Sequence, residues 1–259
     1  MKSGGGFRRA RVARERGHTL LFLDEIRAIK PVFLDTDIDM TAVQAYRSAE
    51  RAGLRYSVVS HVLHVASRVL AVHPDANAAM RGHLWPQVAW YDSVNGKVTL
   101  DKNLNGHRVV VSTVLNDVHR MSIDEIQERV EHFREGDPAT MPEFAPMRTL
   151  QRLPRPLSRL AFRLGVRPLA GRARTMGTFA VTSLGHRPVD GFYSVGGTTI
   201  TLGIGRIADR PAVRDGRVAV VPLMRLSLTF DHRVIDGAEA ADVLAEIKDG
   251  LENWKEGRV

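Results

Sequence analysis

The spacing of apolar residues along the chain predicts four amphipathic helices. In each of them apolar side chains recur every three or four positions, so that they share one face of a helix. Gly53 ends the first helix and Pro74 ends the second. The third has a clear start, because Ser122 followed by Glu125 is the pattern of a capping box. The predicted helices cover residues 41–52, 57–73, 122–136 and 237–254.

Extended segments lie between these helices and in the second half of the chain. They are rich in β-branched residues or alternate between apolar and polar positions. Asn95-Gly96 predicts a tight turn between two of them. Residues 108–115 are nearly all apolar after the first position, which predicts a buried strand. The predicted strands cover residues 31–40, 88–91, 97–100, 108–115, 178–182, 198–204, 218–221 and 225–230.

Residues 148–174, the arginine-rich segment, combine arginines and leucines in a basic amphipathic pattern that prolines interrupt. The pattern favours surface helices whose apolar face packs on their own domain. Docking to an anionic partner is the alternative. A nucleic-acid partner is disfavoured, because no helix-turn-helix or RNA-binding signature accompanies the arginines. The arginines are Arg148, Arg152, Arg155, Arg159, Arg163, Arg167, Arg172 and Arg174.

Composition narrows the classes of protein that the chain can belong to. Its 259 residues are 44% hydrophobic, enough for one large domain or two small ones. Without cysteine it has no disulfide, thiolate nucleophile or cysteine-bound zinc. The apolar run at residues 19–23 is too short for a signal peptide or a membrane span, so we expect a cytoplasmic protein. The net charge of +8 raises the question of an anionic partner, such as a phosphorylated cofactor or an acidic carrier protein.

Two hexapeptides share the pattern H-R-x-x-D-G, one beginning at His186 and one at His232. His232 directly follows the most regular alternating strand and precedes the last predicted helix, so it lies at the end of a rigid element. His186 lies in a stretch rich in glycine and proline, which predicts a loop. We therefore expect His232 to be the functional histidine.

Two other patterns are poor candidates for sites. His61 and His64 are three residues apart on a predicted helix, but no third ligand is in view, so we expect no metal site there. Gly203-x-Gly205 lacks the strand-turn-helix context of a dinucleotide fingerprint. A turn or a tightly packed strand is the expected structure at these glycines.

The second hexapeptide belongs to a longer stretch, Asp231 to Gly237, that resembles the D-H-R-x-x-D-G signature of the dihydrolipoamide acyltransferases of 2-oxo-acid dehydrogenase complexes. Chloramphenicol acetyltransferase and peptide-synthetase condensation domains carry a related motif with a second histidine in place of Asp231. The resemblance extends over most of the chain from about Pro31 onward. It also rests on residues 37–41, 56–80 and 177–185.

The resemblance implies a chloramphenicol-acetyltransferase-like α/β fold, a mixed sheet flanked by helices that assembles as a trimer. His232 of one subunit would be the general base and Thr182 of its neighbour would stabilise the oxyanion. Asp236 would support the loop that carries His232, through an arginine for which Arg8 to Arg16 are the candidates. Coenzyme A thioester would be the co-substrate, transfer would be direct, and no metal is expected.

The chain also departs from that family. We expect a basic N-terminal arm over residues 1–30 and a catalytic domain over residues 31–259, with a basic amphipathic insertion at about 145–175 and no lipoyl attachment. These departures favour a free-standing acyltransferase that moves an acyl group, in the first instance acetyl, from CoA or a carrier-protein thioester to a small-molecule hydroxyl or thiol. Two alternatives remain open: a dihydrolipoamide acyltransferase component of a 2-oxo-acid dehydrogenase complex, and a catalytically silent trimeric scaffold.

Overall fold

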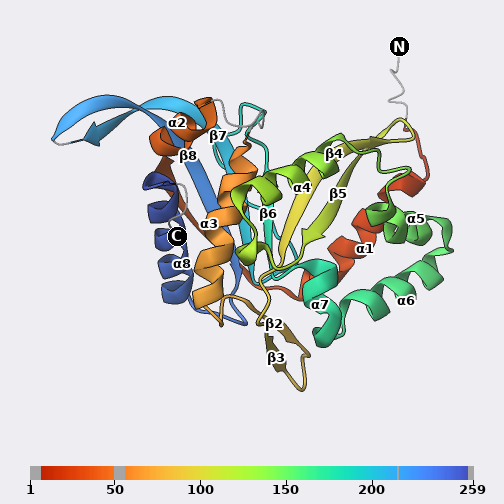
Figure 1. The fold of residues 1–259 in the computed structure, drawn as a ribbon. Helices are drawn as coiled ribbons and strands as arrows, with labels where there is room; N and C mark the ends of the chain where they lie inside the picture. The colour runs from red at the N-terminus through yellow and green to blue at the C-terminus, as the bar shows by residue number, and fades with distance from the viewer. Residues whose placement is uncertain (1–6, 50–55, 215, 256–259) are drawn as a thin grey trace, which may run out of the picture.

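A six-stranded mixed sheet with the order β1-β8-β7-β6-β4-β5 forms the centre of the protein (Figure 1). The computed structural model describes residues 7–49, 56–214 and 216–255. Strand β6 runs parallel to both of its neighbours, β4 and β7, and the remaining pairs are antiparallel. The strands are β1 Pro31–Asp39, β4 Gly96–Leu104, β5 His107–Leu115, β6 Phe179–Ser183, β7 Ile200–Arg214 and β8 Arg217–Asp231. A separate ribbon pairs β2 Ala78–Arg81 with β3 Gln87–Trp90.

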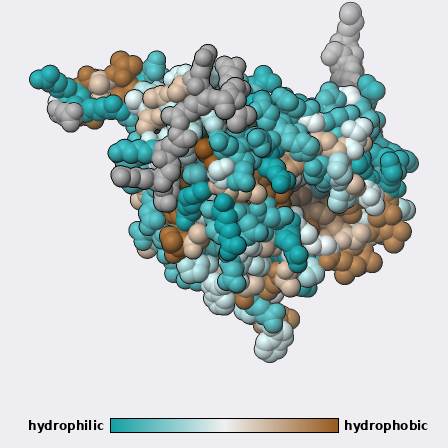
Figure 2. All heavy atoms as spheres, in the orientation of Figure 1, coloured by the Kyte–Doolittle hydropathy of each residue, from teal (hydrophilic) through white to brown (hydrophobic). Residues whose placement is uncertain are grey.

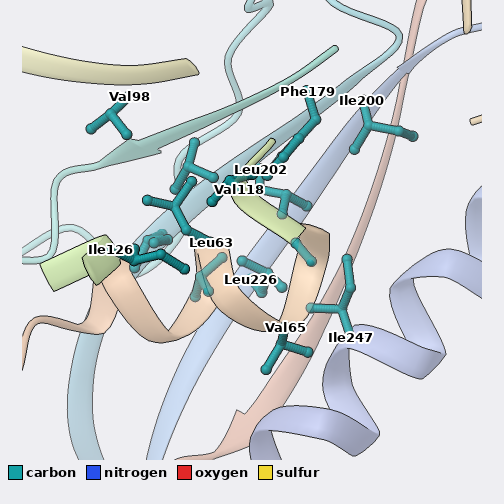
Figure 3. Close-up of a cluster of buried hydrophobic side chains, with 14 of the residues drawn as sticks. Leu63, Val65, Val98, Val118, Ile126, Phe179, Ile200, Leu202, Leu226 and Ile247 are labelled. Atoms are coloured by element: carbon teal, nitrogen blue, oxygen red, sulfur yellow. The ribbon is translucent and has the colours of Figure 1, made fainter. Parts of the chain in front are cut away.

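One face of the sheet packs against helices and forms the apolar core (Figure 3). The helices are α2 Thr41–Ser48, α3 Val58–Val72, α4 Ile123–Glu135 and α8 Gly237–Glu252. Leu63 of α3 and Phe179 of β6 both lie close to Gly96, Ile126 of α4 belongs to the same cluster, and all three are fully buried. Burial of each such side chain stabilises the fold by about 1.5–3 kcal/mol. The mixed sheet flanked by helices that we expected is confirmed.

The ends of the two central helices follow the predicted capping pattern. Ser57 precedes α3, and its Oγ accepts a hydrogen bond from the backbone N–H of Ser60 at 3.0 Å. Ser122 and Glu125 form the predicted capping box at α4. The first predicted helix begins as expected at Thr41, whereas Gly53, its predicted end, lies outside the described residues.

The opposite face of β4 and β5 is covered by α1 Gly17–Glu25 and by the three short helices α5 Ala145–Arg152, α6 Arg155–Val166 and α7 Leu169–Met176 (Figure 1). The N-terminal region therefore includes a helix that packs on the arginine-rich segment. Glu25 pairs with Arg167 at 3.0 Å and Asp24 with Arg163 at 3.7 Å. Single 3-10 turns occupy Arg14–Arg16, Ile26–Ala28, Val118–Arg120 and Pro142–Phe144.

The apolar side chains of the arginine-rich segment divide into two groups. Phe162 and Val166 face the domain, as the favoured interpretation expected. Leu157, Leu160 and Leu164 of α6 are exposed instead, and Figure 2 shows apolar surface on this side of the molecule. No helix among the described residues has the length and apolar character needed to cross a bilayer.

The hairpin predicted around Asn95-Gly96 is wrong. Strand β3 pairs with β2, while β4 begins at Gly96 and pairs with β5 and β6. The buried side chain of Asn95 donates to the Ala173 carbonyl and accepts from the Asp117 N–H. These long-range hydrogen bonds fix Asn95 in an extended connection, where the dipeptide statistics of a turn do not apply.

Two further strand predictions need correction. Residues 108–115 form an edge strand, β5, in which Val110 and Ser112 are exposed, so the strand is buried on one face only. The segments 218–221 and 225–230 form one continuous strand, β8. Pro222 interrupted the pattern, but it lies beyond the end of β1 and pairs only with β7, where a missing N–H costs little.

His73 joins the end of α3 to α8 and should make stability depend on pH. Its Nδ1 lies 2.8 Å from Glu239 Oε1 and its Nε2 lies 3.1 Å from Glu246 Oε1. Burial lowers the pKa of His73, but the two carboxylates outweigh it and the pKa is raised above 6.5. The stabilisation is therefore complete below the unfolded-state pKa and is lost as pH rises through the folded-state pKa. We expect the urea unfolding midpoint of the unchanged protein to exceed that of His73→Gln by more at pH 6 than at pH 9. An equal difference in midpoint at the two pH values would contradict this.

Candidate active site

His232 lies in a short loop between β8, which ends at Asp231, and α8, which begins at Gly237. Its backbone N–H donates to the Lys30 carbonyl at 2.9 Å, and its ring lies 5.4 Å from the ring of Phe230. The side chain is 46% exposed. The main chain of His232 is thus held at both sides while the imidazole stays accessible to a substrate.

Asp231 is the buried anchor of this loop. Its carboxylate accepts from Arg233 Nε at 2.9 Å and from Arg233 Nη2 at 2.5 Å, and its carbonyl accepts from the Val234 N–H at 2.9 Å. The backbone N–H of Lys30 donates to the same carboxylate at 3.3 Å. The arginine that holds the loop is therefore Arg233, and it acts on Asp231.

Asp236 contacts the catalytic candidate itself. Its Oδ1 lies 3.3 Å from Nδ1 of His232, and its side chain is 90% exposed. Within the described part of the chain no arginine pairs with Asp236; Arg14, one of the expected candidates, donates to the carbonyls of Gln151 and Arg152. Asp236 occupies the N-cap position of α8 but makes no side-chain cap hydrogen bond.

Thr182 lies on β6, on the face of the sheet opposite the core. Phe179 and Val181 point into the core, so Ala180 and Thr182 point to the other side. The side chain of Thr182 is largely buried, and among the described residues its hydroxyl has no hydrogen-bond partner. The hydroxyl is therefore free to donate a hydrogen bond to a ligand.

The strand register separates Thr182 from His232 within one chain. Thr182 pairs with Gly203, and Gly203 pairs with Ser227 two strands away. His232 follows Ser227 by five positions, which at about 3.3 Å per residue and about 4.8 Å per strand places the two backbones roughly 15–20 Å apart. A single reacting carbonyl cannot contact both side chains of the same chain.

Comparison with known proteins shows which families and structures this chain resembles. Residues 148–257 match the model of the 2-oxoacid dehydrogenases acyltransferase catalytic domain. The match covers less than half of the chain. The match includes the arginine-rich segment and ends beyond α8. A dihydrolipoyllysine-residue acetyltransferase component of the pyruvate dehydrogenase complex from Bacillus subtilis (strain 168) is 57% identical over 47 residues, which are 18% of this chain and 11% of that protein. The aligned part is thus about a tenth of this relative.

Solved structures extend the likeness in fold to nearly the whole chain. A probable dihydrolipoamide acetyltransferase from Listeria monocytogenes 4b F2365 is similar with a TM-score of 0.72 at 17% identity, over 98% of both chains. A dihydrolipoamide acetyltransferase from Azotobacter vinelandii gives 0.70 at 22% identity, over 96% of this chain and 93% of that one. Chloramphenicol acetyltransferase gives 0.52 at 15% identity, over 93% and 96%. The expected fold family is confirmed.

The two H-R-x-x-D-G hexapeptides lie in different local structures. The one at His232 connects a strand to a helix, and the one at His186 lies in a loop. His186 lies in an exposed turn, as predicted. Asp190 of that hexapeptide pairs with Arg206 at 2.6 Å and Arg210 at 2.8 Å, a surface role that leaves His186 outside the site. Gly203 lies in a tightly packed strand, because a Cβ there would meet the Phe192 carbonyl oxygen at 1.7 Å.

The two histidines of α3, His61 buried and His64 half-buried, pack against an aromatic side chain. The rings of His61 and His64 lie 4.6 Å and 5.1 Å from the ring of Trp254. Burial lowers the pKa of His61 to about 4 and that of His64 to about 3, so both are neutral at pH 7. Their positions favour a role in the core.

Sequence reasoning missed Lys97 of β4. Lys97 is 4% exposed, its Nζ donates to the Gly196 carbonyl, and it lies 4.8 Å from the centre of the Phe22 ring. Burial, followed by the charge of Arg172, lowers the pKa of Lys97 to about 7. The alternation of side chains along β4 would have predicted the face of the sheet on which Lys97 lies. Its burial depends on α1 and the arginine-rich segment, which are distant in sequence.

The contact between Asp236 and His232 can be tested by substitution. In Asp236→Ala the imidazole loses the group that orients Nδ1, and we expect kcat for acyl transfer to fall on the order of tenfold with KM nearly unchanged. In Asp236→Asn an amide oxygen can still accept the hydrogen bond, so kcat should recover to within about threefold. Steady-state kinetics of both variants check this, and equal losses in the two would contradict an orienting role.

Proposed function

We propose that this protein is an acyltransferase that moves an acyl group between the thiol of CoA and a dihydrolipoyl thiol. The observation that carries the proposal is the placement of His232, with Asp236 on Nδ1 and an accessible ring at the end of β8. A proton on Nδ1, facing Asp236, leaves the lone pair of Nε2 free to act as a base. The name of the Bacillus subtilis relative supports the dihydrolipoyl acceptor, the alternative of the sequence analysis, over the free-standing transfer to a small-molecule hydroxyl or thiol that the sequence favoured.

The transfer needs one proton shuttle. His232 Nε2 takes the proton of the attacking thiol, and the thiolate sulfur adds to the carbonyl carbon of the thioester. The C–S bond to the leaving thiol then breaks as the tetrahedral intermediate collapses. The imidazolium returns its proton to the leaving thiolate, so the enzyme ends the cycle unchanged. The electrophile is a thioester from the start, and the side chains of this chain provide proton transfer and charge stabilisation.

Thr182 would stabilise the intermediate from a neighbouring subunit. Its free hydroxyl can donate to the oxyanion, but in one chain it lies far from His232, so a second copy must bring the two together. A trimer satisfies this with three equivalent sites. Two relatives in fold support it: the cubic core of a pyruvate dehydrogenase complex, and the Azotobacter vinelandii enzyme, whose catalytic mechanism was studied at a serine, a histidine and an asparagine four positions after that histidine.

The test is product analysis with purified protein. We expect acetyl-CoA and dihydrolipoamide to give acetyl-dihydrolipoamide and free CoA, both detected by mass spectrometry. His186→Ala, a change in the exposed hexapeptide, serves as the matched control and should leave the rate unchanged. Acetylation of small alcohols alone would overturn the dihydrolipoyl acceptor in favour of a hydroxyl acceptor. A protein that binds acetyl-CoA and forms no product with either acceptor would overturn the enzymatic function in favour of a scaffold.

A further inference from the structure

A cavity of about 650 Å³ lies between the outer face of β4 and β5 and the helices α1, α5, α6 and α7. Its volume is in the range of small-molecule sites, which are mostly apolar with a few polar groups. None of His232, Asp236 and Thr182 lines it. The apolar wall includes Phe22, Phe144, Met147, Leu150, Leu153 and Phe162.

Lys97 is the buried cation of this wall. It lies on the floor of the cavity, and among the described residues its Nζ has one acceptor, the Gly196 carbonyl, and no carboxylate partner. An ammonium group has three N–H donors, so hydrogen-bonding capacity remains. A buried charge without a counter-ion is unfavourable, and burial lowers the pKa of Lys97. An anion that entered the cavity would supply the missing partner.

The other charged groups around the cavity leave it electropositive. Glu143 is already paired, at 3.0 Å, with His132. Arg174 also lines the cavity and has no acidic partner among the described residues. His18 is held by the Val110 carbonyl at 2.8 Å and by the Gln151 side chain at 3.1 Å. Arg172, close enough to lower the pKa of Lys97, adds to the positive field.

We infer that this cavity binds an apolar monocarboxylate, such as a medium-chain fatty acid, with its carboxylate on Lys97 and its hydrocarbon chain along the Phe, Met and Leu side chains. The two parts of the wall match the two parts of such a ligand: one buried cation and a continuous apolar surface. A small polar anion would leave the apolar wall unfilled, and an alcohol would leave Lys97 without a counter-ion. The inference does not depend on the proposed acyl transfer.

The site does lie near one of the acyl-transfer residues. Lys97 is paired with Ala180, and the next outward-facing residue of β4, Thr99, is paired with Thr182. Lys97 and Thr182 therefore share the outer face of the sheet on neighbouring strands, two positions apart. A ligand bound on Lys97 would therefore lie on the same face of the sheet as Thr182, and its binding can be measured without any turnover.

The test is calorimetric titration of the full chain, without acyl-CoA, with sodium decanoate, decanol and acetate. We expect decanoate to bind most tightly, and Lys97→Met to weaken decanoate at least about tenfold while leaving decanol within twofold. Lys255→Met, which removes one exposed lysine, is the matched control for net charge and should bind decanoate like the unchanged protein. Equal decanoate affinity in Lys97→Met and the unchanged protein would overturn the inference, as would acetate binding as tightly as decanoate.

A second variant tests the apolar wall without touching Lys97. Gly165 of α6 lines the cavity, and a Cβ there would meet no atom within 4 Å, so Gly165→Leu adds side-chain volume at the wall. We expect it to weaken decanoate more than hexanoate. Gly171→Leu on α7, where a Cβ also meets no atom within 4 Å and which lies outside the cavity lining, is the control for helix propensity. An unchanged preference for chain length in Gly165→Leu would contradict the placement of the hydrocarbon chain.

Discussion

His232→Ala should lower kcat for acyl transfer by about 10²–10⁴-fold, the usual contribution of a positioned general base. The thiol of the acceptor would then lose its proton to bulk solvent, and the leaving thiolate would take its proton from there as well. KM for acetyl-CoA should change little, because the imidazole acts on the reacting sulfur. Stopped-time assays of acetyl-dihydrolipoamide at saturating substrate measure the effect.

The fold of this variant is easily checked. The ring of His232 is 46% exposed, and the loop is held by its backbone and by Asp231. Thermal unfolding of His232→Ala should therefore match that of the unchanged protein. Retention of more than a tenth of the rate in a folded variant would exclude His232 as the base.

Thr182→Ala should lower kcat by roughly 10²-fold, because it removes a hydrogen-bond donor to the oxyanion. The sharper result concerns the mixture of the two variants. If His232 and Thr182 act from different subunits, trimers assembled from equal amounts of His232→Ala and Thr182→Ala contain sites in which both residues are intact. Random assembly gives about one quarter of such sites. Co-expression followed by kinetics of the purified mixed trimers should recover about that fraction of the activity.

The alternative outcome is equally clear. If each site used both residues of one chain, every site in the mixture would lack one of them, and the mixture would be no more active than the better single variant. The register of β6, β7 and β8 excludes close approach within a chain. Size measurement of each variant before mixing controls for loss of assembly.

Patterns of apolar and capping residues correctly predicted the helices that depend on interactions between residues close in sequence. Helices α3 and α4 have an apolar face and a capping serine, and both features are encoded within a few residues. The failed hairpin at Asn95-Gly96 has the opposite origin. Asn95 makes hydrogen bonds to residues around 117 and 173, and these contacts decide its conformation. The continuity of β8 through Pro222 likewise depends on where the neighbouring strand ends.

The candidate site was predictable only in part. His232 could be singled out because it follows a regular strand and lies in a motif that resembles the acyltransferase signature. The ion pair between Asp231 and Arg233 was not predicted, although the two are only two residues apart. Which carboxylate pairs with Arg233 depends on the burial of Asp231, and local sequence does not show that burial. Lys97 could not be found, since its burial is produced by helices formed from residues 17–25 and 145–176.

The hydrogen bonds of Lys30 also bear on when the site forms during folding. Lys30 holds both Asp231 and His232 through its backbone, across a separation of 201 positions along the chain. In the described part of the chain, strand β1, which follows Lys30, has β8 as its one neighbour in the sheet. Contacts of such high sequence separation form late, because loop closure must precede them. During synthesis β1 therefore stays unpaired until β8 has been made. The loop that carries His232 reaches its final conformation only when these two strands pair.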